Sequence, residues 1–373
     1  MIKVVTIVGT RPELIRLSRI IPLLDKYVNH ILVHTGQNYD YELNEVFFKD
    51  LEIRKPDYFF NVNTTSVGTF IGETIIRSEQ MIRKEQPDAI LILGDTNSSL
   101  AALMAKRMKV PIYHMEAGNR SFDMNVPEEI NRKVVDHLAD FNLVYTEHSR
   151  RHLLAEGLPH RMIYLTGSPM GEVLDYYRNK IETSDILNKL KIKEKEYIVV
   201  SLHREENVDK PEHLNKLISI LKRIRKEFDK EVIVSTHPRT KNRLEKLKMD
   251  LPDNIRFLKP FGFLDYIKLQ EAAFCTVSDS GTISEEAAIL GFPAITLRNS
   301  MERPEAMDAG TIILTGMSEE VVLKAIKMVT STESNYRNMP EEYKVKNTSE
   351  RVLNIILGTA RLSNKWQGIN KND

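Results

Sequence analysis

Residues 4–27, VVTIVGTRPELIRLSRIIPLLDKY, begin with a short apolar run and continue into a longer segment with helical periodicity. The run VVTIV (4–8) has the length and the Val/Ile content of a buried strand. The same alternation continues through the first half of the chain, where we predict further strands at 30–36, 89–95, 111–118, 142–147 and 162–167. Continuously apolar strands that alternate with helices predict a parallel sheet covered by helices on both faces.

The strand–helix pattern restarts in the second half of the chain. Here we predict strands at 197–205, 231–238, 254–260, 274–281, 293–299 and 311–316. The polar segment 170–193 is strand-poor and is predicted to connect the two halves. The sequence therefore predicts an α/β protein with two doubly wound domains, residues 1–170 and 171–348, and a closing helix at 349–363. Open α/β sheets bind ligands at the carboxyl ends of their strands, so we expect an active site in the cleft between the domains.

Charge and cysteine content exclude several classes of protein. Lys plus Arg is 53 and Asp plus Glu is 52, whereas nucleic-acid-binding and polybasic membrane-binding proteins carry a clear positive excess. The single cysteine, Cys275, excludes a disulfide framework and a cysteine-based zinc site. There is no signal-peptide profile and no apolar run of bilayer length. We therefore expect a cytoplasmic protein that needs neither metal nor cofactor.

Three familiar chemistries lack their sequence signatures. No G-x-G-x-x-G follows a predicted strand, so the usual dinucleotide fingerprint is missing. No G-x-x-x-x-G-K-[ST] is present, which argues against a P-loop nucleotidase. The sequence VSDSG (277–281) lacks the leading glycine of a nucleophile elbow, which weakens a serine-hydrolase interpretation.

Polar residues stand at several predicted strand ends of the first half. Arg11 lies beside a helix start marked by Pro12, where a guanidinium and a helix N-terminus would together bind an anion. Asp95 and Glu116 end two successive strands, so both carboxylates should face one crevice. Each residue also has a structural explanation, as a surface arginine, a helix cap or a strand-end hydrogen-bonding group, and these alternatives remain open.

Two further candidates lie in NVPEEINR (125–132) and in HREEN (203–207). Glu128 and Arg132 are four residues apart on one face of a predicted helix, either as an exposed salt bridge or as part of the site. His203 is predicted at a strand end, where a histidine can act as an acid, a base or a phosphate partner near neutral pH.

The segment SDSGTISEEA (278–287) predicts a strand end followed directly by a helix start. Ser280 and Gly281 would present a hydroxyl and open backbone amides to a diphosphate at the helix N-terminus. Glu286, about one turn further on, could accept hydrogen bonds from ribose hydroxyls. A capping box explains the helix start but not the second glutamate. Together with the acids of the first half, this pattern favours a nucleotide-sugar substrate.

Seven segments resemble, in order, the motifs of the non-hydrolysing UDP-N-acetylglucosamine 2-epimerase family: GTRPE, GDTNS, EAGNRS, PEEINR, HREEN, SDSGTISEEA and ERPEA. The resemblance implies two Rossmann-like domains of the glycosyltransferase-B type, a homodimer, and a C-terminal helix that packs back on the first domain. It implies catalytic roles for Asp95, Glu116, Glu128, Arg132 and His203, and substrate binding by Arg11, Arg16, His203, Ser280, Gly281 and Glu286. Arg16 stands where the family usually has a lysine.

The resemblance implies inversion at C2 of a UDP-sugar without a cofactor, by elimination of UDP, formation of a 2-acetamidoglycal and re-addition of UDP. Four segments are similar to the capsule and O-antigen branch: TGQNYD, MEAGNRSFDMNVPEEINR, STHPR and TGSPM. Of two candidate substrates, UDP-N-acetylglucosamine and UDP-2-acetamido-2,6-dideoxy-L-talose, we therefore favour the second. The latter reaction gives UDP-N-acetyl-L-fucosamine for cell-surface polysaccharides. A hydrolysing 2-epimerase, a UDP-sugar glycosyltransferase and a non-catalytic sugar-nucleotide-binding module remain alternatives. We expect no nucleic-acid or membrane partner.

Overall fold

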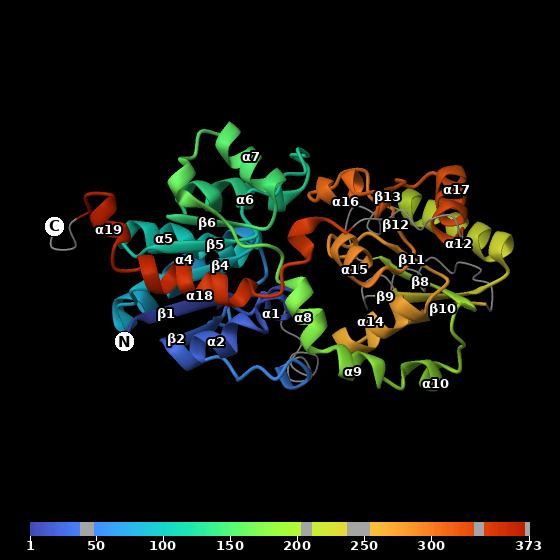
Figure 1. Cartoon of the computed structure of the whole chain (residues 1–373), viewed down its shortest axis with the longest axis horizontal. Coiled ribbons are helices and arrows are strands. Elements are labelled where there is room, and N and C mark those ends of the chain that lie inside the picture. Colours follow the sequence, from blue (N-terminus) through green and yellow to red (C-terminus); the bar gives the residue numbers. More distant parts are fainter. Residues whose placement is uncertain (38–47, 203–210, 237–253, 332–338, 370–373) are drawn as a thin grey trace. The chain divides into compact units, whose positions relative to one another are not determined.

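The computed structural model describes residues 1–37, 48–202, 211–236, 254–331 and 339–369. The chain divides into two compact units (Figure 1). The first consists of Met1–Asp175 and Lys344–Asp373, and the second of Tyr176–Tyr343. The chain therefore leaves the first unit once and returns to it at its C-terminal end.

The first unit contains a seven-stranded sheet in which all neighbouring strands are parallel, in the order β3-β2-β1-β4-β5-β6-β7. Its strands are β1 (Lys3–Val8), β2 (Asn29–His34), β3 (Tyr58–Phe59), β4 (Ala89–Leu93), β5 (Ile112–Met115), β6 (Phe141–Val144) and β7 (Ile163–Leu165). The strand order reverses between β1 and β4, which makes the carboxyl ends of these two strands the switch point where ligands bind in such sheets.

The second unit contains a six-stranded parallel sheet in the order β10-β9-β8-β11-β12-β13. Its strands are β8 (Tyr197–Leu202), β9 (Glu231–Thr236), β10 (Ile255–Leu258), β11 (Cys275–Ser278), β12 (Ala294–Thr296) and β13 (Ile313–Leu314). The order reverses between β8 and β11, so the SDSG segment follows a strand at the switch point. Both units have the doubly wound topology that the sequence predicts.

Helices cover both sheets (Figure 1). The helices of the first unit are α1 (Arg11–Leu17), α2 (Ile20–Tyr27), α4 (Val67–Glu85), η1 (Asn97–Ala101), α5 (Ala102–Arg107), α6 (Pro127–Leu138), α7 (Glu147–Ala155), η2 (His160–Met162), α8 (Met170–Tyr176), α18 (Thr348–Thr359) and α19 (Ser363–Trp366). Those of the second are α9 (Arg178–Glu182), α10 (Ile186–Leu190), α12 (Pro211–Phe228), α14 (Phe263–Ala272), α15 (Ile283–Leu290), α16 (Pro304–Asp308), α17 (Glu319–Thr330) and η3 (Glu341–Tyr343).

Alternating strand residues build a core on each face of a sheet, because successive side chains of a strand point to opposite faces. On β8, Ile198 and Val200 are buried against residues of α12 and α17. Tyr197 and Val199, which alternate with them along the strand, are buried with Leu269 of α14 on the other face. Burial on both faces explains why these strands are continuously apolar in the sequence.

Several predicted strands extend past the observed ends. The prediction of 89–95 exceeds Ala89–Leu93, and that of 111–118 exceeds Ile112–Met115. Gly94 and Glu116 have φ angles of +74° and +64°, which lie outside the extended region that a strand requires. The two-residue strand β3 was not predicted, because it is too short to form an apolar run.

The boundaries of the units differ from the predicted 170/171 and 348/349 by a few residues at each crossing. Most of α8 belongs to the first unit, where Val173 and Leu174 are fully buried. The predicted closing helix appears as α18 and α19 in the first unit. Within the described part of the chain, no helix combines the length and apolar character that a membrane crossing requires.

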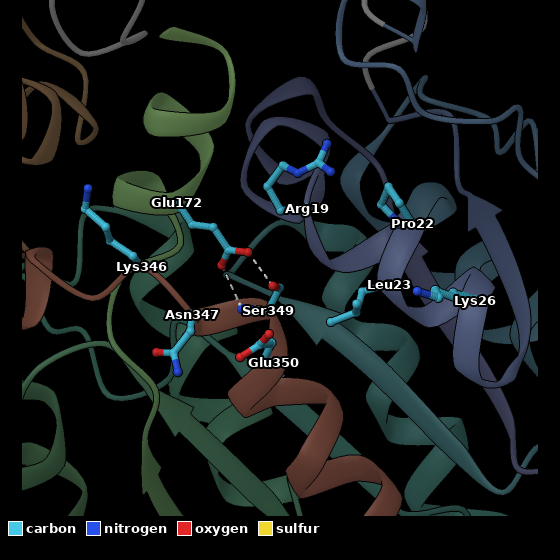
Figure 2. A pocket seen from close by; sticks show the side chains of 9 residues that line it. All are labelled: Arg19, Pro22, Leu23, Lys26, Glu172, Lys346, Asn347, Ser349 and Glu350. Carbon is cyan, nitrogen blue, oxygen red and sulfur yellow. Dashed lines mark hydrogen bonds between the residues drawn. The ribbon is translucent and has the colours of Figure 1, made fainter.

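The side chain of Glu172 on α8 caps the N-terminus of helix α18. Glu172 accepts hydrogen bonds from the backbone N–H of Ser349, at 2.9 Å, and from its hydroxyl (Figure 2). Thr348 adds hydrogen bonds from its hydroxyl to the carbonyls of Thr166 and Ser168. The bond from the Ser349 N–H satisfies one of the free amides at the helix N-terminus, and the hydroxyl bonds hold the first turn in place.

We expect Glu172→Gln to lower the free energy of unfolding by about 1–2 kcal/mol, because the amide replaces one of two accepting oxygens. Glu350→Gln, on the exposed side of the same first turn, is the matched control and should cost about 0.5 kcal/mol or less. Urea unfolding of the three proteins measures both effects. Equal destabilisation by the two variants would show that the cap contributes nothing beyond its charge.

Candidate functional site

The end of β1 contacts the polar turn that follows β4. A Cβ added to Gly9 would lie 1.9 Å from Ser98 Oγ and 2.6 Å from Thr35 Oγ1, so this close approach requires glycine. The two hydroxyls are themselves 2.7 Å apart. The carboxyl ends of β1, β2 and β4 therefore meet in one polar cluster at the switch point.

Glu13, in the GTRPE segment, joins two of these strand ends. Its Oε2 accepts hydrogen bonds from the N–H groups of Gly9 (2.7 Å) and Thr10 (2.6 Å) and from the Thr10 hydroxyl (2.9 Å). Its Oε1 accepts from the hydroxyl of Thr96 at 3.0 Å. Burial raises the pKa of Glu13 to about 7, against the opposing effect of the hydrogen bonds.

Glu13 was not singled out from the sequence, although the T-x-x-E spacing of a capping box was visible there. Only the fold brings it to Thr96, the residue after Asp95. The predicted site residue Arg11 is half-buried at the first position of α1. Glu13 thus fixes the turn that carries Arg11 against the turn that carries Asp95.

Asp95 lies directly beyond the β4 end and forms an ion pair with Arg132 of α6. Arg132 also donates from Nη1 to Glu129 Oε2 at 2.9 Å, and both of these side chains are almost fully buried. Asn131 donates to the carbonyl of Asp95 at 3.0 Å. Glu128, predicted on the same helix face as Arg132, is exposed in the first turn of α6.

Glu116 follows β5 and forms an ion pair with another arginine, Arg16 of α1. Its Oε2 lies 3.6 Å from Arg16 Nε, and the guanidinium carbon of Arg16 lies 5.7 Å from the ring centre of Tyr145. Asn119 donates to the other carboxylate oxygen at 3.4 Å. The left-handed backbone of Glu116 is strained for a non-glycine residue, and such strain is concentrated at functional sites.

Four of the predicted site residues, Asp95, Arg132, Glu116 and Arg16, therefore meet at neighbouring strand ends of the first unit. Glu128 lies on the surface of α6. Asp95 is paired with Arg132, and Glu116 is paired with Arg16. An added Cβ on Gly94 would lie 3.9 Å from Glu116 Oε2, which puts this carboxylate beside the residue before Asp95. Two carboxylates, each with its own arginine, therefore line the carboxyl edge of β4 and β5.

In the second unit the SDSG segment forms the predicted turn between a strand and a helix. Ser278 Oγ accepts from the N–H of Ser280 at 3.0 Å, and Ser280 Oγ accepts from the N–H of Thr282 at 3.3 Å. Helix α15 begins at the next residue, as predicted. Glu286 is buried in this helix and accepts from Gln270 at 2.9 Å.

Two arginines of the polar loop 298–311, which the sequence places at another strand end, surround Gly281. A Cβ added to Gly281 would lie 3.0 Å from Arg303 Nη1 and 3.5 Å from Arg298 Nη1. Arg303 donates to the Gly281 carbonyl at 3.1 Å and pairs with Glu285 at 3.0 Å, and Arg298 pairs with Glu302. This cluster places guanidinium groups beside a helix N-terminus, a combination suited to phosphate. The predicted His203 lies outside the described residues.

A surface pocket of about 350 Å³ lies elsewhere in the first unit, between α2, α8 and the start of α18 (Figure 2). Its lining includes Arg19, Lys26, Lys346 and Glu350, and shares no residue with the strand-end groups. The described residues contain no group of three or more His, Cys, Asp or Glu side chains arranged to hold a metal ion.

Comparison with known proteins identifies a family and several relatives of this chain. The family model described as UDP-N-acetylglucosamine 2-epimerase matches residues 24–357. A solved structure of UDP-N-acetylglucosamine 2-epimerase from Rickettsia bellii is 50% identical, covers 98% of each chain and has a TM-score of 0.92. The UDP-N-acetylglucosamine 2-epimerase of Methanocaldococcus jannaschii is 35% identical over 95% of this chain and 98% of its own length.

Two further matches have a particular sugar nucleotide in their names. A crystal structure of the M. jannaschii UDP-GlcNAc 2-epimerase in complex with UDP-GlcNAc and UDP is 33% identical, covers 96% of this chain and all of its own, and has a TM-score of 0.89. The UDP-2,3-diacetamido-2,3-dideoxy-D-glucuronate 2-epimerase of Pseudomonas aeruginosa is 32% identical over 87% of this chain and 91% of its own.

The fold and these matches define an isomerase of the epimerase type, built on two Rossmann-like domains of the glycosyltransferase-B class. The chain belongs to the UDP-N-acetylglucosamine 2-epimerase family. The family and the fold predicted from the sequence are thereby confirmed.

Proposed function

We propose that this protein is a non-hydrolysing UDP-N-acetylhexosamine 2-epimerase, which inverts C2 of a UDP-sugar. One observation carries the proposal: Asp95 and Glu116 follow neighbouring strands, and each is paired with a different buried arginine. Inversion by removal and return of a proton needs two groups that exchange protons with opposite faces of the sugar. Two separately paired carboxylates meet that requirement.

The proposed reaction begins with loss of UDP, because C2 has no adjacent carbonyl to stabilise a carbanion. The C1–O bond breaks and its electron pair leaves with UDP, while one carboxylate takes the C2 proton. The product is a 2-acetamidoglycal. A second group then returns a proton to the opposite face of C2, and UDP re-adds at C1. The positive charge that develops at the sugar ring would be stabilised by the carboxylates.

The leaving diphosphate is proposed to bind to the second unit. The Ser280 hydroxyl, the amides around Gly281 and the guanidinium of Arg303 form the group suited to it. Glu286 would accept hydrogen bonds from the ribose, and Arg11, Arg16 and His203 are further substrate-binding candidates. Glu128 and Arg132 are further catalytic candidates, and Arg132 is the one in contact with Asp95.

The sugar is the open part of the proposal. Named relatives act on UDP-N-acetylglucosamine and on a UDP-diacetamido-dideoxyglucuronate, so members of this family accept different substituents beyond C2. We infer an N-acetylated UDP-sugar. UDP-N-acetylglucosamine is supported by the relatives, and UDP-2-acetamido-2,6-dideoxy-L-talose by the sequence segments that are similar to the capsule and O-antigen branch. The family resemblance also supports a homodimer, which sedimentation analysis would test.

Proton NMR of the protein with each UDP-sugar in deuterated water tests the proposal. We expect deuterium at C2 together with a second UDP-sugar, and the faster substrate identifies the sugar. Free sugar and UDP accumulating together would indicate the hydrolysing alternative. If C2 stays protonated with both sugars and nothing is released, the epimerase proposal fails, and a screen of acceptors for a glycosyltransferase follows.

A further inference from the structure

Arg132 lies between two carboxylates on different elements. Its Nη2 contacts Asp95, which follows β4, and its Nη1 lies 2.9 Å from Glu129 Oε2, three residues earlier on α6. The side chain of Glu129 is fully buried and that of Arg132 is nearly so. A buried carboxylate needs a cation and hydrogen-bond donors, and Glu129 takes both at this position.

Among the described residues, every hydrogen bond to the Glu129 side chain is accepted by one oxygen, Oε2. Oε2 accepts from the Ser121 N–H at 2.9 Å, from the Ser121 hydroxyl at 3.0 Å and from Arg132. Oε1 is buried and accepts no hydrogen bond from the described residues, and Lys133 Nζ lies 4.0 Å from it. The carboxylate therefore ties the loop before α6 to Arg132 through a single atom.

We propose that Glu129 is a positioning residue for the epimerisation, which fixes Arg132 against Asp95 and shares its positive charge with that carboxylate. The inference rests on the proposed function, because Asp95 matters here as a group that exchanges a proton with the sugar. Glu129 fixes the guanidinium through its anchored Oε2. It also takes part of the positive charge of Arg132, so that Asp95 shares this guanidinium with a second carboxylate.

Glu129→Gln tests the shared charge with little change of shape. The amide oxygen can take the place of Oε2 and keep its three hydrogen bonds, while the amide nitrogen takes the place of Oε1. Of the two carboxylates in these contacts with Arg132, only Asp95 then keeps its charge. We expect slower epimerisation in this variant, even though the hydrogen bonds around the oxygen of residue 129 are kept.

The kinetic constants should separate positioning from general damage. A carboxylate that holds the charge of Arg132 alone exchanges a proton with the sugar more slowly, so we expect kcat to fall by about 10-fold, while KM stays within a factor of about two because the diphosphate-binding groups are unchanged.

Ser121→Ala is the matched control. It removes one hydrogen bond from the same oxygen of Glu129 and retains the negative charge. Its kcat should stay within a factor of about three of the wild-type value. An unchanged kcat in Glu129→Gln, or an equal fall of kcat in both variants, with the wild-type protein active, would overturn the inference and leave the epimerase assignment intact. Absence of deuterium uptake at C2 in the wild-type protein would instead overturn the proposed function.

Discussion

Asp95→Asn and Glu116→Gln are each expected to lower the rate of C2 epimerisation at least 100-fold, the usual contribution of a general acid or base. The amides keep the size and much of the hydrogen bonding of the carboxylates but cannot take a proton at neutral pH. Deuterium incorporation at C2, followed by NMR, measures the loss. Glu128→Gln belongs in the same series, because the family resemblance gives this exposed residue a catalytic role.

UDP affinity separates a chemical defect from a binding defect in these variants. The groups proposed for the diphosphate, around Ser280 and Gly281, lie in the second unit and are untouched by the substitutions. We therefore expect UDP binding, measured by titration calorimetry, to stay within a factor of about three. Unchanged epimerisation in all three variants would remove these acids from the mechanism.

Gly118→Ala is expected to have the largest effect on stability, about 3 kcal/mol or more. Gly118 has a φ of +77°, and an added Cβ would lie 2.4 Å from the Ser149 carbonyl oxygen and 2.9 Å from Leu153 Cγ. Left-handed backbone at alanine costs roughly 1–2 kcal/mol, and the backbone contact adds an overpacking cost of similar size. Urea unfolding measures the change.

Gly157→Ala isolates the backbone cost. Gly157 has a φ of +86° and no heavy atom within 4 Å of the added Cβ. We expect this control to lose about 1 kcal/mol. Gly118→Ala should also slow epimerisation in the folded protein, because Glu116 stands two residues earlier in the same turn. Equal destabilisation by the two variants would refute the close contact with Ser149.

The sequence alone determined the class of fold and the places where chemistry is concentrated. Runs such as YIVVSL (197–202) are apolar throughout because both faces of their sheet are buried, and that composition is visible without coordinates. The turn from β11 into α15 was equally readable, since a strand end, a short polar turn and a helix start follow one another within ten residues. Local sequence suffices where the determining contacts are local.

The partners of the buried charges were decided by the tertiary structure. Spacing along α6 suggested Glu128 as the partner of Arg132, whereas Glu129 is the buried carboxylate that bonds Arg132 and the preceding loop. Which glutamate turns inward depends on the rotation of the helix about its axis, and packing against the sheet sets that rotation.

The same reason applies to contacts between strand ends. The pairing of Arg16 with Glu116, the hydrogen bond from Thr96 to Glu13 and the arginines around Gly281 join residues from separate elements. No spacing in the sequence encodes these distances. They follow from the order and register of the parallel strands, which bring distant strand ends to one edge of each sheet.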